Sequence, residues 1–173
     1  MVRRAAVFLL GAFIGLAGCG EMRRAQRLHF PDRSLATVER VAAEIDARLN
    51  GFERRTGKLT SGDVTSVYTA WFDAGELRKI EERLSLGEYG SSTILYYFNN
   101  RTLFFYHELA RRSGMGTVGT GAGERIERAF AYDSIGQIME SRKLVDGRPA
   151  ALEDYEVMAV RNHAAELKRE LAR

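Results

Sequence analysis

The most reactive side chains in this sequence are one cysteine, Cys19, and three histidines, His29, His107 and His163. The histidines are scattered along the chain, and none has a second ligand at a spacing typical of a metal site. His163 and Glu166 would share one face of a helix, but a single pair at this spacing is weak evidence for acid–base chemistry. No serine has a base at a spacing that would activate it as a nucleophile. The sequence therefore predicts no catalytic residue, no metal site and no cofactor.

A glycine-rich string, Gly114-Met-Gly116-Thr-Val-Gly119, has the glycine spacing of dinucleotide-binding loops. Such a loop joins a strand to a helix whose N-terminus holds the pyrophosphate. Here the string lies within a longer run, Ser113 to Gly123, and a strand-like segment, Ile126 to Tyr132, follows it. We interpret the run as a long hairpin loop and expect no nucleotide ligand.

The N-terminal residues have the organisation of an export signal. Arg3 and Arg4 precede an apolar run, Ala5 to Leu16, which is short for a transmembrane helix. The run ends in Leu16-Ala17-Gly18-Cys19, which resembles the lipobox of bacterial lipoproteins. The resemblance implies that a diacylglycerol is attached to the Cys19 sulfur, that the chain is cut before Cys19, and that the new amino terminus is acylated, for example with palmitate. The alternatives are a short transmembrane anchor and an ordinary secretory signal.

This resemblance implies a protein of the bacterial cell envelope, anchored in a membrane through the lipid on Cys19. Gly20 follows Cys19 where Asp would retain the protein at the inner membrane, so by resemblance to enterobacterial sorting we expect the outer membrane, facing the periplasm. Cleavage would remove Arg3 and Arg4 and lower the net charge from +3 to +1, so we expect no nucleic-acid partner. Acylation would also leave no free thiol and therefore no disulfide.

The chain is expected to have three parts. Residues 1–18 form the signal peptide that is removed, residues 19–33 a polar, arginine-rich lipidated tether, and residues 34–173 a single α+β domain. The arginines of the tether either are solvated or contact anionic lipid headgroups.

Two helices are predicted at the ends of the domain. Ser34 is a favourable N-cap for the first helix, and Gly51 is a natural stop. Its apolar stripe comprises Leu35, Val38, Ala42, Ile45 and Leu49. The second helix is expected from about Ala150 to Leu171, with Pro149 at its start. Its stripe comprises Val157, Val160, Ala164, Leu167 and Leu171.

Three segments between the helices resemble one another. Each is an aromatic-rich run that reaches Asp or Asn, turns, and resumes with an aliphatic residue; the turn residues are Asp73, Asn99 and Asp133. Aromatic residues favour strands, and Asp and Asn favour turns, so we predict three hairpins, or about six strands in an antiparallel meander packed against the two helices. Residues 76–85 also fit helical spacing, but we predict a strand there because the segment after Asn99 repeats the pattern with strongly strand-forming residues.

The repeated phrase, two aromatic residues, Asp or Asn, and Leu four positions later, is similar to repeats of YwqK-type antitoxin and MORN-like proteins. Those proteins also stack short β-hairpins. The glycine that usually follows the Asn in their repeats survives here only as Gly75. The resemblance covers less than half of the chain and implies hairpins without implying a function.

Large apolar residues occupy both faces of the two central strands, Leu95 to Phe98 and Leu103 to Tyr106. A half-solvated antiparallel strand would alternate apolar with polar residues. Either the protein covers both faces itself, or Tyr96, Phe98, Phe104 and Tyr106 belong to a partly exposed surface that binds a partner.

The sequence thus favours a membrane-anchored lipoprotein that acts as a non-enzymatic protein-interaction or scaffolding module for an unknown envelope protein. The alternatives are a periplasmic carrier of a hydrophobic ligand, which would need an apolar cavity of at least about 300 Å³, and a hydrolase built around His107 or His163.

Overall fold

The computed structural model describes residues 28–113 and 123–173. Within them lies one 8-stranded antiparallel sheet in which every strand pairs with its neighbour in the chain. The strands are β1 (Glu53–Ser61), β2 (Val64–Asp73), β3 (Glu76–Ser85), β4 (Gly90–Asn99), β5 (Thr102–Arg112), β6 (Glu124–Tyr132), β7 (Ile138–Val145) and β8 (Arg148–Pro149). The helices are α1 (Leu35–Asp46) and α2 (Asp154–Leu171), with short 3₁₀ turns η1 (Leu49–Gly51) and η2 (Gly87–Tyr89).

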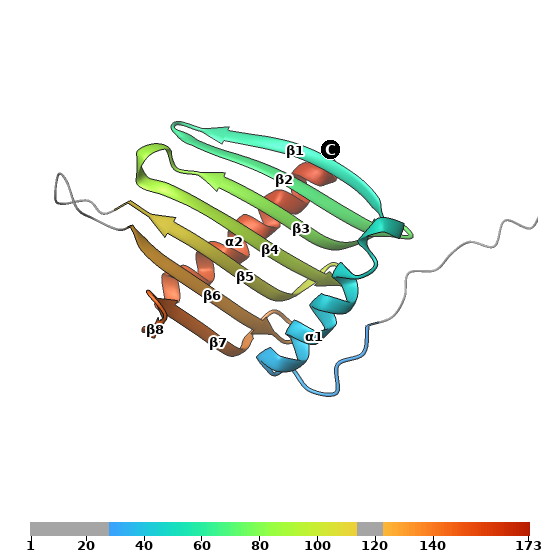
Figure 1. Ribbon diagram of the computed structural model, residues 1–173. Helices are drawn as coiled ribbons and strands as arrows, with labels where there is room; N and C mark the ends of the chain where they lie inside the picture. The colour runs from blue at the N-terminus through green and yellow to red at the C-terminus, as the bar shows by residue number, and fades with distance from the viewer. Residues whose placement is uncertain (1–27, 114–122) are drawn as a thin grey trace, which may run out of the picture.

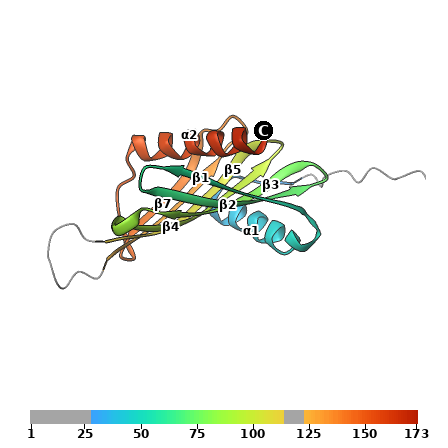
Figure 2. The ribbon, with the colours of Figure 1, turned by 90° about the horizontal axis from the view of Figure 1, so that it is seen from above.

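The helices lie on opposite faces of the sheet, which gives three layers (Figure 1). α2 crosses behind the strands in Figure 1, whereas α1 lies in front of one end of them. The view from above shows that α1 extends under only part of its face (Figure 2). No helix of residues 28–113 and 123–173 covers the rest of that face.

The α+β class and the antiparallel meander are confirmed, but the predicted number of about six strands is wrong, since the described residues form eight. β1 was missed because it is an edge strand with almost every side chain exposed, so it shows no apolar alternation. β8 is two residues long and leaves no periodic signal.

The first helix starts as predicted. Ser34 is the N-cap of α1, and its hydroxyl accepts a hydrogen bond from the Thr37 backbone N–H at 3.3 Å. The second helix starts later than expected, at Asp154, because a capping box formed by Glu153 and Glu156 fixes its first turn. Pro149 is not at the helix start but in β8, at the edge of the sheet, where its missing N–H is tolerated.

All three predicted hairpins are present, as β2–β3, β4–β5 and β6–β7, and residues 76–85 are strand β3. In each hairpin the register shifts at the aromatic residue that precedes the turn, namely at Phe72, Phe98 and Tyr132. The β2–β3 turn has positive φ at Ala74 and Gly75, and the β4–β5 turn has it at Asn100 and Arg101, as type I′ turns require. In the third hairpin Asp133 Oδ1 accepts hydrogen bonds from the backbone N–H groups of Ile135 and Gln137.

The core has two halves, one on each face of the sheet. The half under α1 comprises Leu35, Val38, Val41, Ala42, Ile45, Tyr97, Phe104, Phe105, Ala129 and Ala131. Leu28 and Phe30, from the predicted tether, also pack there. The half under α2 comprises Tyr68, Ala70, Phe72, Leu77, Ile80, Ile94, Tyr96, Phe98, Tyr106, Phe130, Tyr132, Val160, Ala164 and Leu167.

Two features of the sequence lie outside the described residues: the export signal with Cys19, and Gly114 to Gly119. The ends of the glycine-rich run are described, since Arg112 at the end of β5 pairs with Glu124 at the start of β6. In the described part of the chain, neither helix is long and apolar enough to cross a membrane.

Candidate functional site

The four aromatic residues proposed as an interaction surface are buried. Tyr96, Phe98, Phe104 and Tyr106 are exposed by 1%, 0%, 1% and 2%, and their neighbours Tyr97 and Phe105 are buried as well. Of the two alternatives, the partly exposed surface at these positions is wrong, because the two helices cover opposite faces of the central strands. The apolar character of both faces therefore reflects a sheet that is packed on both sides.

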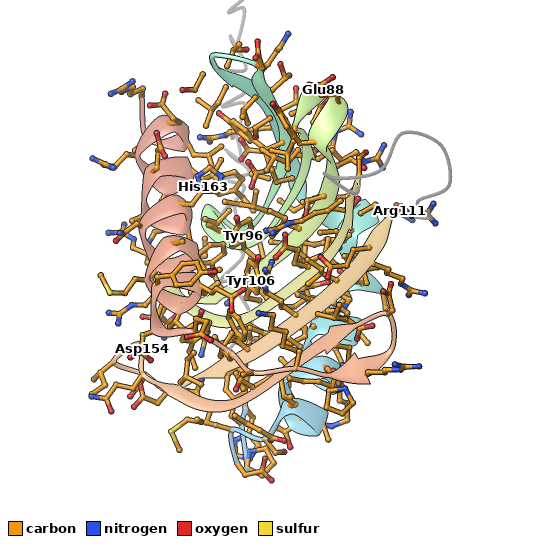
Figure 3. All side chains as sticks on the ribbon, turned by 90° about the vertical axis from the view of Figure 1, so that its left-hand side faces the viewer. Glu88, Tyr96, Tyr106, Arg111, Asp154 and His163 are labelled. Carbon is orange, nitrogen blue, oxygen red and sulfur yellow. The ribbon has the colours of Figure 1, made fainter. Side chains whose placement is uncertain are left out.

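Polar chemistry is concentrated between α2 and the sheet. Glu82, on β3, is fully buried and is held by three side chains. His163 Nε2 lies 2.8 Å from Glu82 Oε1, and the Tyr96 hydroxyl donates to Glu82 Oε2 at 3.1 Å. The Ser66 hydroxyl also donates to this carboxylate. Figure 3 shows His163 on α2 facing the sheet, close to Tyr96 and Tyr106.

A second group of charges lies beside the first. Arg128, on β6, donates to Glu108 at 2.6 Å and to Glu156 of α2 at 2.7 and 3.0 Å. Glu108 also accepts from the Ser92 and Tyr106 hydroxyls at 2.6 and 2.8 Å. Lys143, on β7, donates to Glu156 at 2.8 Å. The three carboxylates of the two groups, Glu82, Glu108 and Glu156, therefore face three basic side chains.

The hairpin repeat explains this arrangement. The same interval along the chain separates Ser66 from Ser92, Phe72 from Phe98 and Glu82 from Glu108. In each of the first two hairpins the serine and the glutamate lie 16 residues apart and hydrogen-bond each other. In the second hairpin Glu108 pairs with Ile94. At the equivalent position of the third hairpin Lys143 pairs with Arg128, so a lysine replaces the glutamate. The repeat thus supplies two acidic positions and one basic position to the face under α2.

The contacts favour the charged forms of His163, Glu82 and Glu156. The hydrogen bond to Glu82 raises the pKa of His163 in spite of burial, with a further contribution from Glu166, whose Oε2 lies 3.4 Å from Nδ1. Burial alone would raise the pKa of Glu82, but the hydrogen bonds from His163 and Ser66 outweigh it and lower that pKa. Burial likewise opposes ionisation of Glu156, and its bonds from Lys143 and the Glu153 backbone prevail and lower its pKa.

This cluster is stabilising rather than reactive in its geometry. Both ring nitrogens of His163 face carboxylates, and the Ser66 hydroxyl is directed at Glu82 rather than at the imidazole. A hydrolytic nucleophile requires its hydroxyl to hydrogen-bond the base. A cleft of about 230 Å³ reaches the cluster and is lined by charged and aromatic side chains, including Glu108, Arg128, Tyr155 and His163.

The other histidines lie apart from this cluster. His107 is on the opposite face, with Nε2 at 3.7 Å from Glu127 Oε1, and His29 is exposed. Among residues 28–113 and 123–173, no three His, Cys, Asp or Glu side chains are grouped as a metal site would require.

Comparisons with known proteins return no match: no family model, no curated protein and no solved structure is similar to this chain.

The face that α1 leaves uncovered is the second candidate site. Six residues lie opposite one another in register across it, namely Val67, Arg83, Thr93, Leu109, Glu127 and Leu144. Val67 and Leu109 are 49% and 40% exposed, although β2 and β5, which carry them, are both paired on two sides within the sheet. The row next to it, toward α1, contains the half-buried Leu95 and His107. This open face combines aliphatic with charged side chains from six neighbouring strands.

Sequence reasoning missed both sites. The repeated Ser–Glu spacing could have indicated the buried pairs, because both residues recur at the same place in consecutive hairpins. The open face has no such signal, since it depends on how far α1 extends over the sheet.

Proposed function

We propose that this chain is a lipid-anchored protein of the bacterial envelope, held through Cys19 and facing the periplasm from the outer membrane, and that its domain binds an envelope protein without catalysing a reaction. The lipobox supports the anchor and its location. The open face of the sheet supports the binding role, and it is the observation that carries the proposal.

The open face suits a protein partner for a physical reason. Antiparallel sheets are commonly solvated on one side, but the solvated side is then polar. Here Val67 and Leu109 remain exposed in one cross-strand row with Arg83 and Glu127. A partner that covers this row would remove aliphatic surface from water and meet charges of both signs, a combination typical of protein interfaces.

The geometry gives less support to a carrier of hydrophobic ligands. The clefts lined by Tyr96 and Tyr106 and by Phe98 have volumes of about 230 and 160 Å³, below the size of a typical ligand cavity. A larger cleft of about 550 Å³ lies between hairpin turns and the end of α2, but the charged residues Glu76, Arg101 and Lys168 line it beside Phe72 and Leu77, so it is not the apolar cavity that such a carrier needs.

The experiment is site-specific photo-crosslinking of the acylated protein in its native envelope. A photoreactive residue in place of Val67 or Leu109 is expected to capture one envelope protein in stoichiometric amount. Tyr155 and Met158, exposed by 70% and 62% on α2, are the matched control positions and are expected to capture none of it. Equal capture from all four positions, or capture of lipid alone, contradicts the proposal.

Attachment of the lipid is tested separately. Incorporation of labelled palmitate is expected in the unmodified chain and is expected to disappear in Cys19→Ser. Labelling of Cys19→Ser at the level of the unmodified chain would contradict the anchor.

A further inference from the structure

A small cleft lies between the C-terminal half of α2 and two hairpin turns, on the face of the sheet opposite the open face. Its volume is about 160 Å³. Phe98, Leu103 and Ala164 line it with apolar surface, and Arg161 and Lys168 of α2 contribute two positive charges. The Tyr132 side chain, from the end of β6, lines the same cleft.

The Tyr132 hydroxyl has no hydrogen-bond partner among the described residues, although the residue is only 1% exposed. A buried hydroxyl is almost always paired, because leaving it unpaired loses the bonds that it made to water. Tyr96 and Tyr106, which also lie beneath α2, donate to Glu82 and Glu108. The buried Tyr132 hydroxyl has no such acceptor among the described residues, so a ligand in the cleft could accept its hydrogen bond.

The cations of the cleft also differ from the two that lie beside the buried carboxylates under α2. Arg128 and Lys143 each contact a buried carboxylate. In the described part of the chain, no carboxylate lies within 4 Å of the charged nitrogens of Arg161 or Lys168. Lys168 instead donates to the Arg101 carbonyl oxygen at 2.5 Å and lies over the Phe98 ring at 5.8 Å.

Both positively charged side chains line the same cleft. Arg161 reaches from α2 toward the β6–β7 loop, where its Nη2 lies 3.8 Å from the position that a Cβ on Gly136 would occupy. Burial lowers the pKa of Lys168, and the positive charge of Arg101 lowers it further. A region with uncompensated positive charge and an unpaired hydroxyl donor attracts an anion.

We propose that this cleft binds a phosphate group. Arg161 and Lys168 supply the charge, the Tyr132 hydroxyl donates a hydrogen bond, and Phe98, Leu103 and Ala164 receive the apolar part of the ligand next to the phosphate. A guanidinium and an ammonium together match the charge and the acceptor oxygens of a phosphate ester. The same chemistry is offered by a soluble phosphomonoester and by the headgroup of a phospholipid. The inference is independent of the protein partner proposed for the open face.

The test is isothermal titration of the full acylated chain, in a neutral detergent, with three probes: inorganic phosphate, glycerol 1-phosphate and the water-soluble dihexanoyl phosphatidylglycerol. Binding of the two soluble phosphates indicates a free phosphate or phosphomonoester as the source. Binding of the phosphatidylglycerol alone indicates a lipid headgroup. Either result supports the site if the variants below weaken the binding, and no binding of any probe overturns the proposal.

Arg161→Gln is expected to weaken binding by about tenfold, and Tyr132→Phe by several-fold. Arg169→Gln is the matched control, because it removes the same charge from the same helix outside the cleft lining. It is expected to change the affinity less than twofold. Tyr132→Phe separates a binding role from a structural one: a purely structural hydroxyl would leave the affinity unchanged. Affinity that survives both Arg161→Gln and Tyr132→Phe, or falls equally in Arg169→Gln, overturns the proposal.

Discussion

Arg128 joins β6 to both β5 and α2 through buried charges. It contacts Glu108 and Glu156, and all three side chains are at most 11% exposed. Arg128→Met would leave two carboxylates buried without their main cation. Removing one member of a buried ion pair typically costs about 3–5 kcal/mol. We expect the free energy of unfolding to fall by about 3 kcal/mol at pH 7, measured by urea denaturation.

Arg142→Met is the control for this change. Arg142 also contacts two carboxylates, those of Glu39 and Glu127, but it is 39% exposed. Exposed pairs contribute about 0–1 kcal/mol because water screens them. If both substitutions lower the free energy of unfolding equally, burial does not strengthen the ion pairs of Arg128, and the expected difference between buried and exposed pairs is wrong.

The pair formed by His163 and Glu82 predicts a dependence of stability on pH. Since the folded state raises the pKa of His163, its stabilising effect is complete below the ordinary histidine value of about 6.5 and is lost as pH rises through the raised pKa. Since the folded state lowers the pKa of Glu82, the effect of this group is lost as pH falls through that lowered value. We therefore expect the free energy of unfolding to decline on both sides of an intermediate pH.

Urea denaturation across a pH series tests this dependence. His163→Gln should remove the decline on the alkaline side, whereas His107→Gln keeps His163 and Glu82 and should retain it. An unchanged alkaline limb in His163→Gln would show that other groups cause the decline.

At the scale of elements, two equivalent turns allow a reciprocal test of the hairpin repeat. Ala74 and Asn100 hold the same position in the β2–β3 and β4–β5 turns, with φ of 50° and 48°. Asn tolerates this left-handed conformation better than Ala does. Ala74→Asn is expected to stabilise the protein by about 0.5–1 kcal/mol, and Asn100→Ala to destabilise it by a similar amount, in thermal or urea denaturation. Effects of the same sign in both variants would contradict the equivalence of the turns.

The edge strand β1 depends on a glycine. Gly57 lies opposite Tyr68, and a Cβ at Gly57 would clash with the hydroxyl and ring carbon Cζ of Tyr68. Gly57→Ala should therefore destabilise the domain by about 1 kcal/mol, although alanine costs less backbone entropy than glycine in a strand. This loss of stability should vanish when Tyr68→Val is also present, because the clash with the tyrosine ring is then removed. A loss that persists in the double variant would mean that the backbone at position 57, rather than Tyr68, requires glycine.

The same elements show why prediction from sequence succeeded only in part. The three hairpins were found because aromatic strands and Asp or Asn turns recur, and α1 was found because Ser34 precedes an apolar stripe. The start of α2 was misplaced because Pro149 suits an edge strand as well as a helix start. The role of Tyr96 or Phe104 could not be predicted, because a residue packed under a helix and one beneath a partner protein have the same local sequence.

At the scale of the whole molecule, the two helices make the two faces of the sheet unequal. α2 crosses its face of the sheet (Figure 1), and both the larger half of the apolar core and the buried charged groups lie between α2 and the strands. α1 is shorter and covers the other face only near one end of the strands (Figure 2). We call this end, which carries the β2–β3, β4–β5 and β6–β7 turns, the hairpin-turn end. The domain therefore has a closed face with a small cationic cleft and a half-open face with exposed aliphatic residues, so that two ligands could be bound without competing.

The attachment of the chain predicts how the domain is oriented. Phe30 packs on Phe104 with ring centroids 4.8 Å apart, and Arg33 donates to the Tyr132 carbonyl oxygen, so the chain enters the domain at the hairpin-turn end. The segment from Cys19 to the first packed residue, Leu28, can span only about 30 Å even when extended. An acylated Cys19 would therefore keep the hairpin-turn end closer to the membrane than the opposite end, where Glu88 lies between β3 and β4.

Single cysteines can measure this orientation, because Cys19 is the only natural cysteine and acylation would block it. Ser134→Cys places a fluorophore at the turn end, and Glu88→Cys places one at the other end, about 30 Å away along the strands. We expect stronger energy transfer to a headgroup acceptor from position 134 than from position 88, and transfer from neither when Cys19→Ala is added. Equal transfer from the two positions would mean that the tether does not orient the domain, and undiminished transfer in Cys19→Ala would mean that the lipid on Cys19 is not the anchor.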